Sequence, residues 1–173
     1  IDNRDMTNSV LASVSDRGLM LQRFEGYADF MNKYLEHLTF SEEIYYYVHT
    51  VELSEWRIAL LGLNSAWISC SNRDEEEGLL LGERQVRDAV KKAEKVNPTL
   101  TIALLHHPLR LLRDFDRGDC EALLLDNCDF VLHGHEHQLS TMRLDCPDSS
   151  AMVIAGGASY KERSYANKYN FVQ

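Results

Sequence analysis

The stretch Leu-Thr-Ile-Ala-Leu-Leu-His-His-Pro at residues 100–108 and the stretch Phe-Val-Leu-His-Gly-His-Glu-His at residues 130–137 decide the fold. Each begins with a continuous apolar run, which is typical of a buried strand, and each ends in histidines. Ligands of open α/β sheets bind beyond the carboxyl ends of the strands. Two such strands side by side would therefore bring their histidines to one edge of one sheet.

Three of these histidines, His106, His135 and His137, are candidate metal ligands, because neutral imidazole is the commonest metal ligand in proteins. His135 and His137 flank Glu136 in one loop, so both can reach around a metal centre from that loop. Gly134 permits a sharp turn just before them. A cluster held by hydrogen bonds alone is the simpler alternative, but polar groups are rarely buried without a role.

The remaining histidines receive other roles. His107 is expected to line the pocket or to hydrogen-bond the backbone, and His133 is expected to be buried behind the metal ligands. Asn64, where another apolar run ends, is assigned to the surroundings of the site as well. His37 and His49 fall within a predicted helix and a predicted strand, and are expected to be ordinary surface or core residues.

Outside these two stretches, helix patterns alternate with strand patterns along the sequence. The first forty residues are predicted to be helical, because apolar residues recur there every three or four positions. These residues form one stripe that is expected to pack in the core: Phe24, Tyr27, Met31, Tyr34, Leu35 and Leu38. Helices are also predicted at 83–96 and near 120–126, and further strands at 44–51, 56–63, 140–144, 151–155 and 169–172. This order predicts a layered α/β domain with a sheet flanked by helices.

Composition and charge limit the possible functions. A chain of 173 residues with 45% hydrophobic residues can build one core, so a single domain is predicted over residues 1–173. The net charge of −9 argues against binding to extended duplex nucleic acid, but it is compatible with a phosphate-ester substrate such as a nucleotide in a metal-centred site. No run of about 18 apolar residues occurs, so no membrane-spanning helix is expected. The four cysteines form no C-x-x-C pair, which favours free thiols in a reducing, cytoplasmic compartment.

The two histidine stretches resemble motifs of the calcineurin-like metallophosphoesterases. His106-His107-Pro108 resembles the family's His-x-Pro motif, and Gly134-His135-Glu136-His137 resembles its Gly-His-x-His motif. His135 follows His106 by 29 residues, a separation that also looks like the family. The resemblance implies a β-sandwich flanked by helices, of which this chain would be the C-terminal portion. The strands after residue 139 would complete the second sheet of that sandwich.

The resemblance also implies an activity. Members of the family hydrolyse phosphomonoesters or phosphodiesters at a dinuclear centre of two divalent metal ions (Mn, Fe, Zn or Mg), with a metal-held hydroxide as the nucleophile. By that resemblance, His106 and His135 would bind one ion and His137 the other. The family's Asp-x-His and Gly-Asn-His motifs do not occur in this sequence. We therefore expect the catalytic residues upstream of Ile1, in a longer protein with further domains, and expect this chain alone to be incomplete as an enzyme.

Two other interpretations fit the same residues. A relative that kept the fold but lost its metal ions would be a protein-interaction scaffold rather than an enzyme. A mononuclear zinc site built from the three predicted histidine ligands alone would support a different chemistry. The sequence upstream of Ile1 discriminates between a scaffold and an enzyme, because intact metal-binding motifs there indicate an enzyme and their substitution indicates a scaffold.

Overall fold

One sheet runs through the part of the chain that the computed structural model describes, which comprises residues 1–34, 45–71, 73, 78–136, 139–145 and 149–157. Its strands follow the order β1-β2-β3-β4-β6-β5. The strands β2, β3, β4 and β6 are parallel to one another, whereas β1 and β5 pair antiparallel at the two margins. The carboxyl ends of the four parallel strands therefore share one edge, which we call the carboxyl edge. The bounds are β1 Tyr46–Leu53, β2 Trp56–Leu63, β3 Leu100–Leu105, β4 Phe130–His133, β5 Ser140–Asp145 and β6 Ser150–Ala155.

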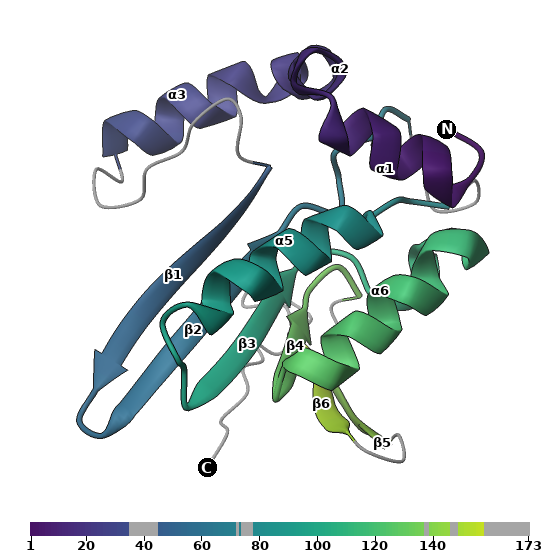
Figure 1. Cartoon of the computed structure of the whole chain (residues 1–173). Helices are drawn as coiled ribbons and strands as arrows, with labels where there is room; N and C mark the ends of the chain where they lie inside the picture. Colours follow the sequence, from purple (N-terminus) through teal and green to yellow (C-terminus); the bar gives the residue numbers. More distant parts are fainter. Residues whose placement is uncertain (35–44, 72, 74–77, 137–138, 146–148, 158–173) are drawn as a thin grey trace, which may run out of the picture.

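In the two central parallel strands, β3 and β4, buried residues alternate with half-buried residues. In β3, Ala103 and Leu105 are buried, while Leu104 between them is half-buried. The buried face packs against α5 (Glu83–Glu94) and α6 (Asp114–Asn127), which lie side by side over it (Figure 1). Because apolar residues occupy both faces, these strands appear in the sequence as continuous apolar runs rather than as alternating patterns.

The N-terminal helices lie beyond the carboxyl edge instead of over a sheet face (Figure 1). They are α1 (Arg4–Ala12), α2 (Val14–Leu21), the short 3-10 helix η1 (Gln22–Phe24) and α3 (Glu25–Tyr34). A second short 3-10 helix, η2 (Leu109–Leu111), follows β3. Within the described residues, no helix combines the length and the apolar character that crossing a membrane requires.

Two sets of contacts fix α1 to the rest of the domain. Leu11 is 1% exposed and packs in a small core cluster with Trp67, which is also 1% exposed. At the start of α5, the buried carboxylate of Glu83 accepts hydrogen bonds from Arg4 at 2.8 Å and from Asn8 at 3.2 Å. A buried carboxylate is stable only when it is paired in this way. The helical segment is thereby held in a defined position beside the carboxyl edge.

The α/β architecture predicted from the sequence is confirmed. The predicted strand 56–63 coincides with β2, which pairs with β1, and the predicted helix 83–96 is α5. The helix predicted near 120–126 begins earlier, at Asp114, and Asp116 in its first turn accepts hydrogen bonds from the backbone N–H groups of Leu81 and Gly82, just before α5. The predicted strand 169–172 lies outside the described residues.

The strands after residue 139 extend this sheet instead of starting a second one. β6 pairs in parallel with β4, from Phe130 opposite Met152 to His133 opposite Ala155, and β5 then pairs with β6. The pairing satisfies the backbone N–H and C=O groups on that side of β4, which would otherwise need other partners. Among the described residues all named strands belong to one sheet, so the second layer of the expected sandwich is not found among them.

The aromatic stripe of the first forty residues does not pack in the core as predicted. Met31 is 8% exposed, but Tyr27 is 55% and Tyr34 is 60% exposed. Leu35 and Leu38 lie outside the described residues. The reason is the position of α3, which lies beyond the carboxyl edge, where it has no sheet face to cover. Part of the stripe, including Tyr27 and Tyr34, is therefore exposed on the surface.

Candidate metal centre

The carboxyl edge brings together histidines from two neighbouring strands. His106 directly follows β3, and His135 follows β4 after one glycine, Gly134. The two strands are parallel neighbours, and the backbone N–H of Gly134 donates to the carbonyl of His106 at 3.1 Å. This hydrogen bond ties the two strand ends together, so the side chains of His106 and His135 lie next to each other.

His135 adopts an unusual backbone conformation. Its φ is 70°, in the left-handed region that residues other than glycine rarely adopt. The backbone N–H of Glu136 donates to the carbonyl of Gly134 at 2.9 Å, which closes a three-residue turn centred on His135. Such turns with a positive central φ are rare and strained. Strain of this kind is concentrated at functional sites, and here it accompanies an imidazole that is directed at His106.

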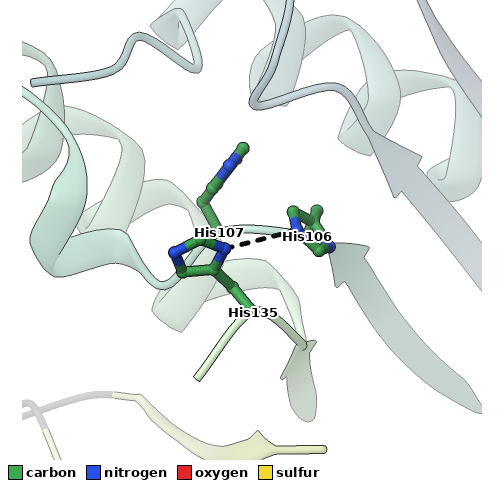
Figure 2. A group of neighbouring side chains, drawn as sticks. All are labelled: His106, His107 and His135. Atoms are coloured by element: carbon green, nitrogen blue, oxygen red, sulfur yellow. Dashed lines mark hydrogen bonds between the residues drawn. The ribbon is translucent and has the colours of Figure 1, made fainter. Parts of the chain in front are cut away.

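Three imidazoles meet around one small space (Figure 2). The metal-binding nitrogens of His106, His107 and His135 all lie within 4.8 Å of one another. The distance between His135 Nδ1 and His106 Nε2 is 3.4 Å, and the ring centroids are 4.7 to 5.3 Å apart. His107 is buried, His135 is half-buried and His106 is exposed, so the cluster is accessible from the side of His106.

The donor set fits a divalent transition-metal ion. Imidazole nitrogen suits Zn, Cu, Fe and Ni, whereas Mg²⁺ prefers oxygen ligands and fits three imidazoles poorly. Two nitrogens that each lie about 2.0–2.1 Å from a tetrahedral zinc ion are about 3.4 Å apart. The separation of His135 Nδ1 and His106 Nε2, 3.4 Å, matches this value, although a hydrogen bond between the two rings also accounts for it. The cluster can therefore hold a metal ion with small adjustments of the rings.

His107 belongs to this cluster, although the sequence assigned it only a pocket role. Its ring is 9% exposed, and its Nδ1 lies 2.9 Å from the hydroxyl of Ser65. The same hydroxyl accepts the backbone N–H of His107 at 3.2 Å. Because Nδ1 contacts Ser65, Nε2 is the nitrogen that would bind a metal ion, as is usual when a neighbouring group orients a ligating imidazole. Sequence analysis missed Ser65, although its place just after the apolar run 56–63 was a usable signal.

The other predicted site residues lie around the cluster or outside the described residues. His133 is 8% exposed, and its Nδ1 lies 3.1 Å from the carbonyl of Gly134, so its ring supports the turn instead of joining the cluster. Asn64 lies in the wall of a cavity that also includes His106. His137 lies outside the described residues, and its assignment as a metal ligand stays a prediction.

Glu136, which lies between the predicted ligands His135 and His137, pairs with an arginine and not with the histidine cluster. The carboxylate of Glu136 accepts hydrogen bonds from the guanidinium of Arg110, one of them at 3.2 Å. These bonds hold the pKa of the Glu136 carboxyl below its ordinary value, so the pair remains charged. Among the described residues, the group that can hold a metal ion contains three imidazoles and no carboxylate. Two adjacent ions need anionic ligands to offset their charge, so the described residues by themselves suit one ion.

Replacing Ser65 by alanine is expected to weaken Zn²⁺ binding roughly 10–100-fold, because the ring of His107 loses the group that orients it. The affinity is measured by competition with a chromogenic chelator. Ser140→Ala, at the exposed start of β5, is the matched control and should leave the affinity unchanged. Equal affinities for the two variants would show that Ser65 does not orient a metal ligand.

Comparisons with known proteins give only distant similarities. No family model matches the chain, and no curated protein matches its sequence. A protein from Staphylococcus aureus described as a 5′-nucleotidase, solved in complex with alpha-ketoglutarate, is similar over 64% of this chain and 23% of its own, with 14% identity and a TM-score of 0.43. GAP50, described as the anchor in the inner membrane complex of Plasmodium, is similar over 74% of this chain and 41% of its own, with 15% identity and a TM-score of 0.44. The chain thus spans less than half the length of either protein, and these similarities assign neither a family nor a function.

Proposed function

We propose that this chain carries the histidine side of the metal centre of a hydrolase that cleaves phosphomonoesters or phosphodiesters. The observation that carries the proposal is the cluster of His106, His107 and His135 at the carboxyl edge. The resemblance of the surrounding motifs to those of the calcineurin-like family supports a phosphoesterase over other metal-dependent hydrolases. The proposal also includes a second ion, held by His137 and by carboxylates from other parts of a longer protein.

The residues of the cluster have complementary tasks in this proposal. A bound divalent ion would polarise a phosphoryl oxygen and lower the pKa of water. His107 and Ser65 form the buried side of the cluster and hold its geometry. His106 forms the exposed side, from which a phosphate ester can approach. His135 closes the cluster from the strained turn after β4.

A non-catalytic scaffold is the second candidate, and one observation favours it. No carboxylate joins the three imidazoles among the residues that the structure describes, and the nearest acid in sequence, Glu136, is paired with Arg110. A metal ion held by imidazoles alone can also have a purely structural role. The exposure of His106 supports the enzyme instead, because catalytic metal sites keep an open position, whereas structural sites are closed.

The protein that contains this chain, loaded with Mn²⁺ or Zn²⁺, is expected to hydrolyse 4-nitrophenyl phosphate or bis(4-nitrophenyl) phosphate. Excess EDTA should abolish the reaction, because the described residues of the cluster provide no other electrophile for the phosphate. Metal content measured by mass spectrometry gives the number of ions for each chain. Residues 1–173 alone should react more slowly, because the carboxylates of the proposed centre lie outside them.

Each result of this assay has a distinct meaning. Metal-dependent hydrolysis with two ions for each chain supports the dinuclear phosphoesterase. Tight metal binding without hydrolysis of either ester would overturn the enzyme and favour the scaffold. A protein that binds neither Mn²⁺ nor Zn²⁺ would overturn the metal site itself.

A further inference from the structure

A cavity of about 900 Å³ adjoins the histidine cluster. It lies between the helices α2 and α3 and the carboxyl edge of the sheet (Figure 1). Its helical wall includes Phe24 and Tyr27, and its sheet wall includes Tyr46, Tyr47 and His106. Because His106 belongs to both the cavity and the cluster, a ligand that fills the cavity can also reach the metal centre.

Aromatic rings line the cavity from both walls. Tyr45 is 7% exposed and meets Tyr46 edge-to-face, with ring centroids 5.4 Å apart. Tyr47 lies over Gly62, where a Cβ atom would collide with the ring, so the missing side chain makes room for it. Burial raises the pKa of Tyr47 above its ordinary value, and the nearby phenol of Tyr27 adds to the effect. The phenol of Tyr47 is therefore neutral, and both the helical wall and the sheet wall contribute aromatic rings to the cavity.

Besides His106 and the tyrosine phenols, four polar side chains of the described residues line the cavity. They are Ser15, Gln22 and Glu25 from the helical segment and Asn64 directly after β2. No lysine or arginine lines the cavity among the described residues, and the only carboxylate is negative like the chain as a whole. A second anionic group is therefore disfavoured there, while a neutral apolar group is favoured. The volume falls within the range of small-molecule sites, about 300–1,000 Å³.

We propose that this cavity binds the flat aromatic group of a phosphate ester whose phosphate lies at the histidine cluster. Aromatic side chains favour flat rings as partners, through edge-to-face or offset-stacked contacts. A nucleobase and a simple aryl group share this chemistry. The phosphate end of the inference rests on the proposed function, whereas the aromatic end rests on the cavity alone.

The test compares AMP with ribose 5-phosphate, which differ by the adenine ring, and phenyl phosphate with methyl phosphate. Binding is measured by isothermal titration calorimetry in the presence of Zn²⁺. AMP is expected to bind about 10-fold more tightly than ribose 5-phosphate, or better, because only AMP fills the cavity. If phenyl phosphate is preferred over methyl phosphate as strongly as AMP is preferred over ribose 5-phosphate, the cavity accepts any aryl group. If only AMP is preferred over its partner, the cavity accepts a nucleobase. Either preference supports the proposal.

Two variants on one helix test the cavity wall. Tyr27→Ala should lower the affinity for AMP about 3–10-fold and leave that for ribose 5-phosphate unchanged. Tyr34→Ala is the matched control, because Tyr34 lies on α3 with similar exposure, 60% against 55%, but does not line the cavity. The control should keep the full preference for AMP. Equal affinities of the two variants for AMP would overturn the proposal.

Adenosine separates failure of this inference from failure of the proposed function, because it has no phosphate. Its binding is followed by saturation-transfer NMR of the adenine protons, also in the His135→Ala variant. If adenosine binds the unchanged protein and the His135→Ala variant, and Tyr27→Ala removes the signal, the inference stands even where the protein hydrolyses no ester. If adenosine gives no signal and AMP binds no better than ribose 5-phosphate, the inference is overturned, whether or not hydrolysis is observed.

Discussion

His135→Ala is expected to lower the affinity for Zn²⁺ by more than about 100-fold, since loss of a ligand should exceed the roughly 10–100-fold loss that follows removal of a supporting group. It should also remove most phosphoesterase activity. His135 supplies one nitrogen of the 3.4 Å pair with His106. Within the described residues, it is the only member of the cluster carried by the loop after β4. Affinity is measured by chelator competition, and activity with bis(4-nitrophenyl) phosphate.

His49→Ala is the matched control for this variant. His49 is half-buried in β1, where it pairs with Leu60 of β2 away from the cluster. The control should bind Zn²⁺ like the unchanged protein. If His135→Ala bound Zn²⁺ as tightly as His49→Ala, the cluster would be a set of hydrogen-bonded histidines rather than a metal site.

The same measurement decides the role of His107. A pocket role, as the motifs predict, gives a loss of roughly 10–100-fold for His107→Ala. A role as third ligand, which its place within 4.8 Å of the other imidazoles suggests, gives the same loss as His135→Ala. His133→Ala should be milder, because its ring contacts the carbonyl of Gly134 instead of the cluster.

The difference between His106 and His107 shows which site residues sequence analysis can find. His106 and His135 each follow an apolar strand run, and the carboxyl-edge rule then brings them together. The orientation of His107 depends on Ser65, which is 42 residues away in sequence. That contact arises only when β2 and β3 align in parallel register. No local pattern contains this information.

The N-terminal helices show a similar limit for the fold. A period of 3.6 residues predicts a helix and the side that carries apolar residues, but not what that side faces. Here the apolar side of α3 divides between the domain, where Met31 is buried, and the cavity, which Tyr27 lines. The pairing of β6 with β4 is likewise a long-range contact. The apolar pattern of residues 150–155 is compatible with a place beside β4 and with a place in a second sheet. Strand and helix types were therefore predictable, whereas the partners of α3 and β6 were not.

Asp116→Ala is expected to lower the free energy of unfolding by about 3 kcal/mol. The carboxylate is 3% exposed and accepts the backbone N–H of Leu81 at 2.6 Å and that of Gly82 at 3.0 and 3.1 Å. It also lies in the first turn of α6, where the helix dipole favours a negative charge. Alanine would leave both N–H groups without this acceptor. A buried donor that loses its hydrogen-bond acceptor costs about 1–3 kcal/mol.

Desolvation of the charge acts against this loss. Burial raises the pKa of the Asp116 carboxyl above its ordinary value, although the N–H groups of Gly82 and Leu81 oppose the shift. Removing the charge therefore relieves some cost, but the two N–H groups stay buried in the loop and still lack an acceptor. Asp116→Asn separates the two effects, because it keeps one acceptor oxygen and carries no charge. Its loss of stability should be smaller than that of Asp116→Ala.

Urea unfolding of the chain measures these changes, with Asp114→Ala as the matched control on the same helix. The side chain of Asp114 is 93% exposed, and its ion pair with Arg117 at 3.0 Å is a surface pair of the kind that contributes little. Equal midpoints for Asp114→Ala and Asp116→Ala would show that the buried carboxylate does not stabilise the loop. The effect should also extend to the cavity, because the side chain of Gln85 hydrogen-bonds both the carbonyl of Leu81, at 2.6 Å, and the backbone N–H of Asn64, at 2.6 Å. Loosening the loop would thus release the backbone of a cavity-lining residue next to the histidine cluster.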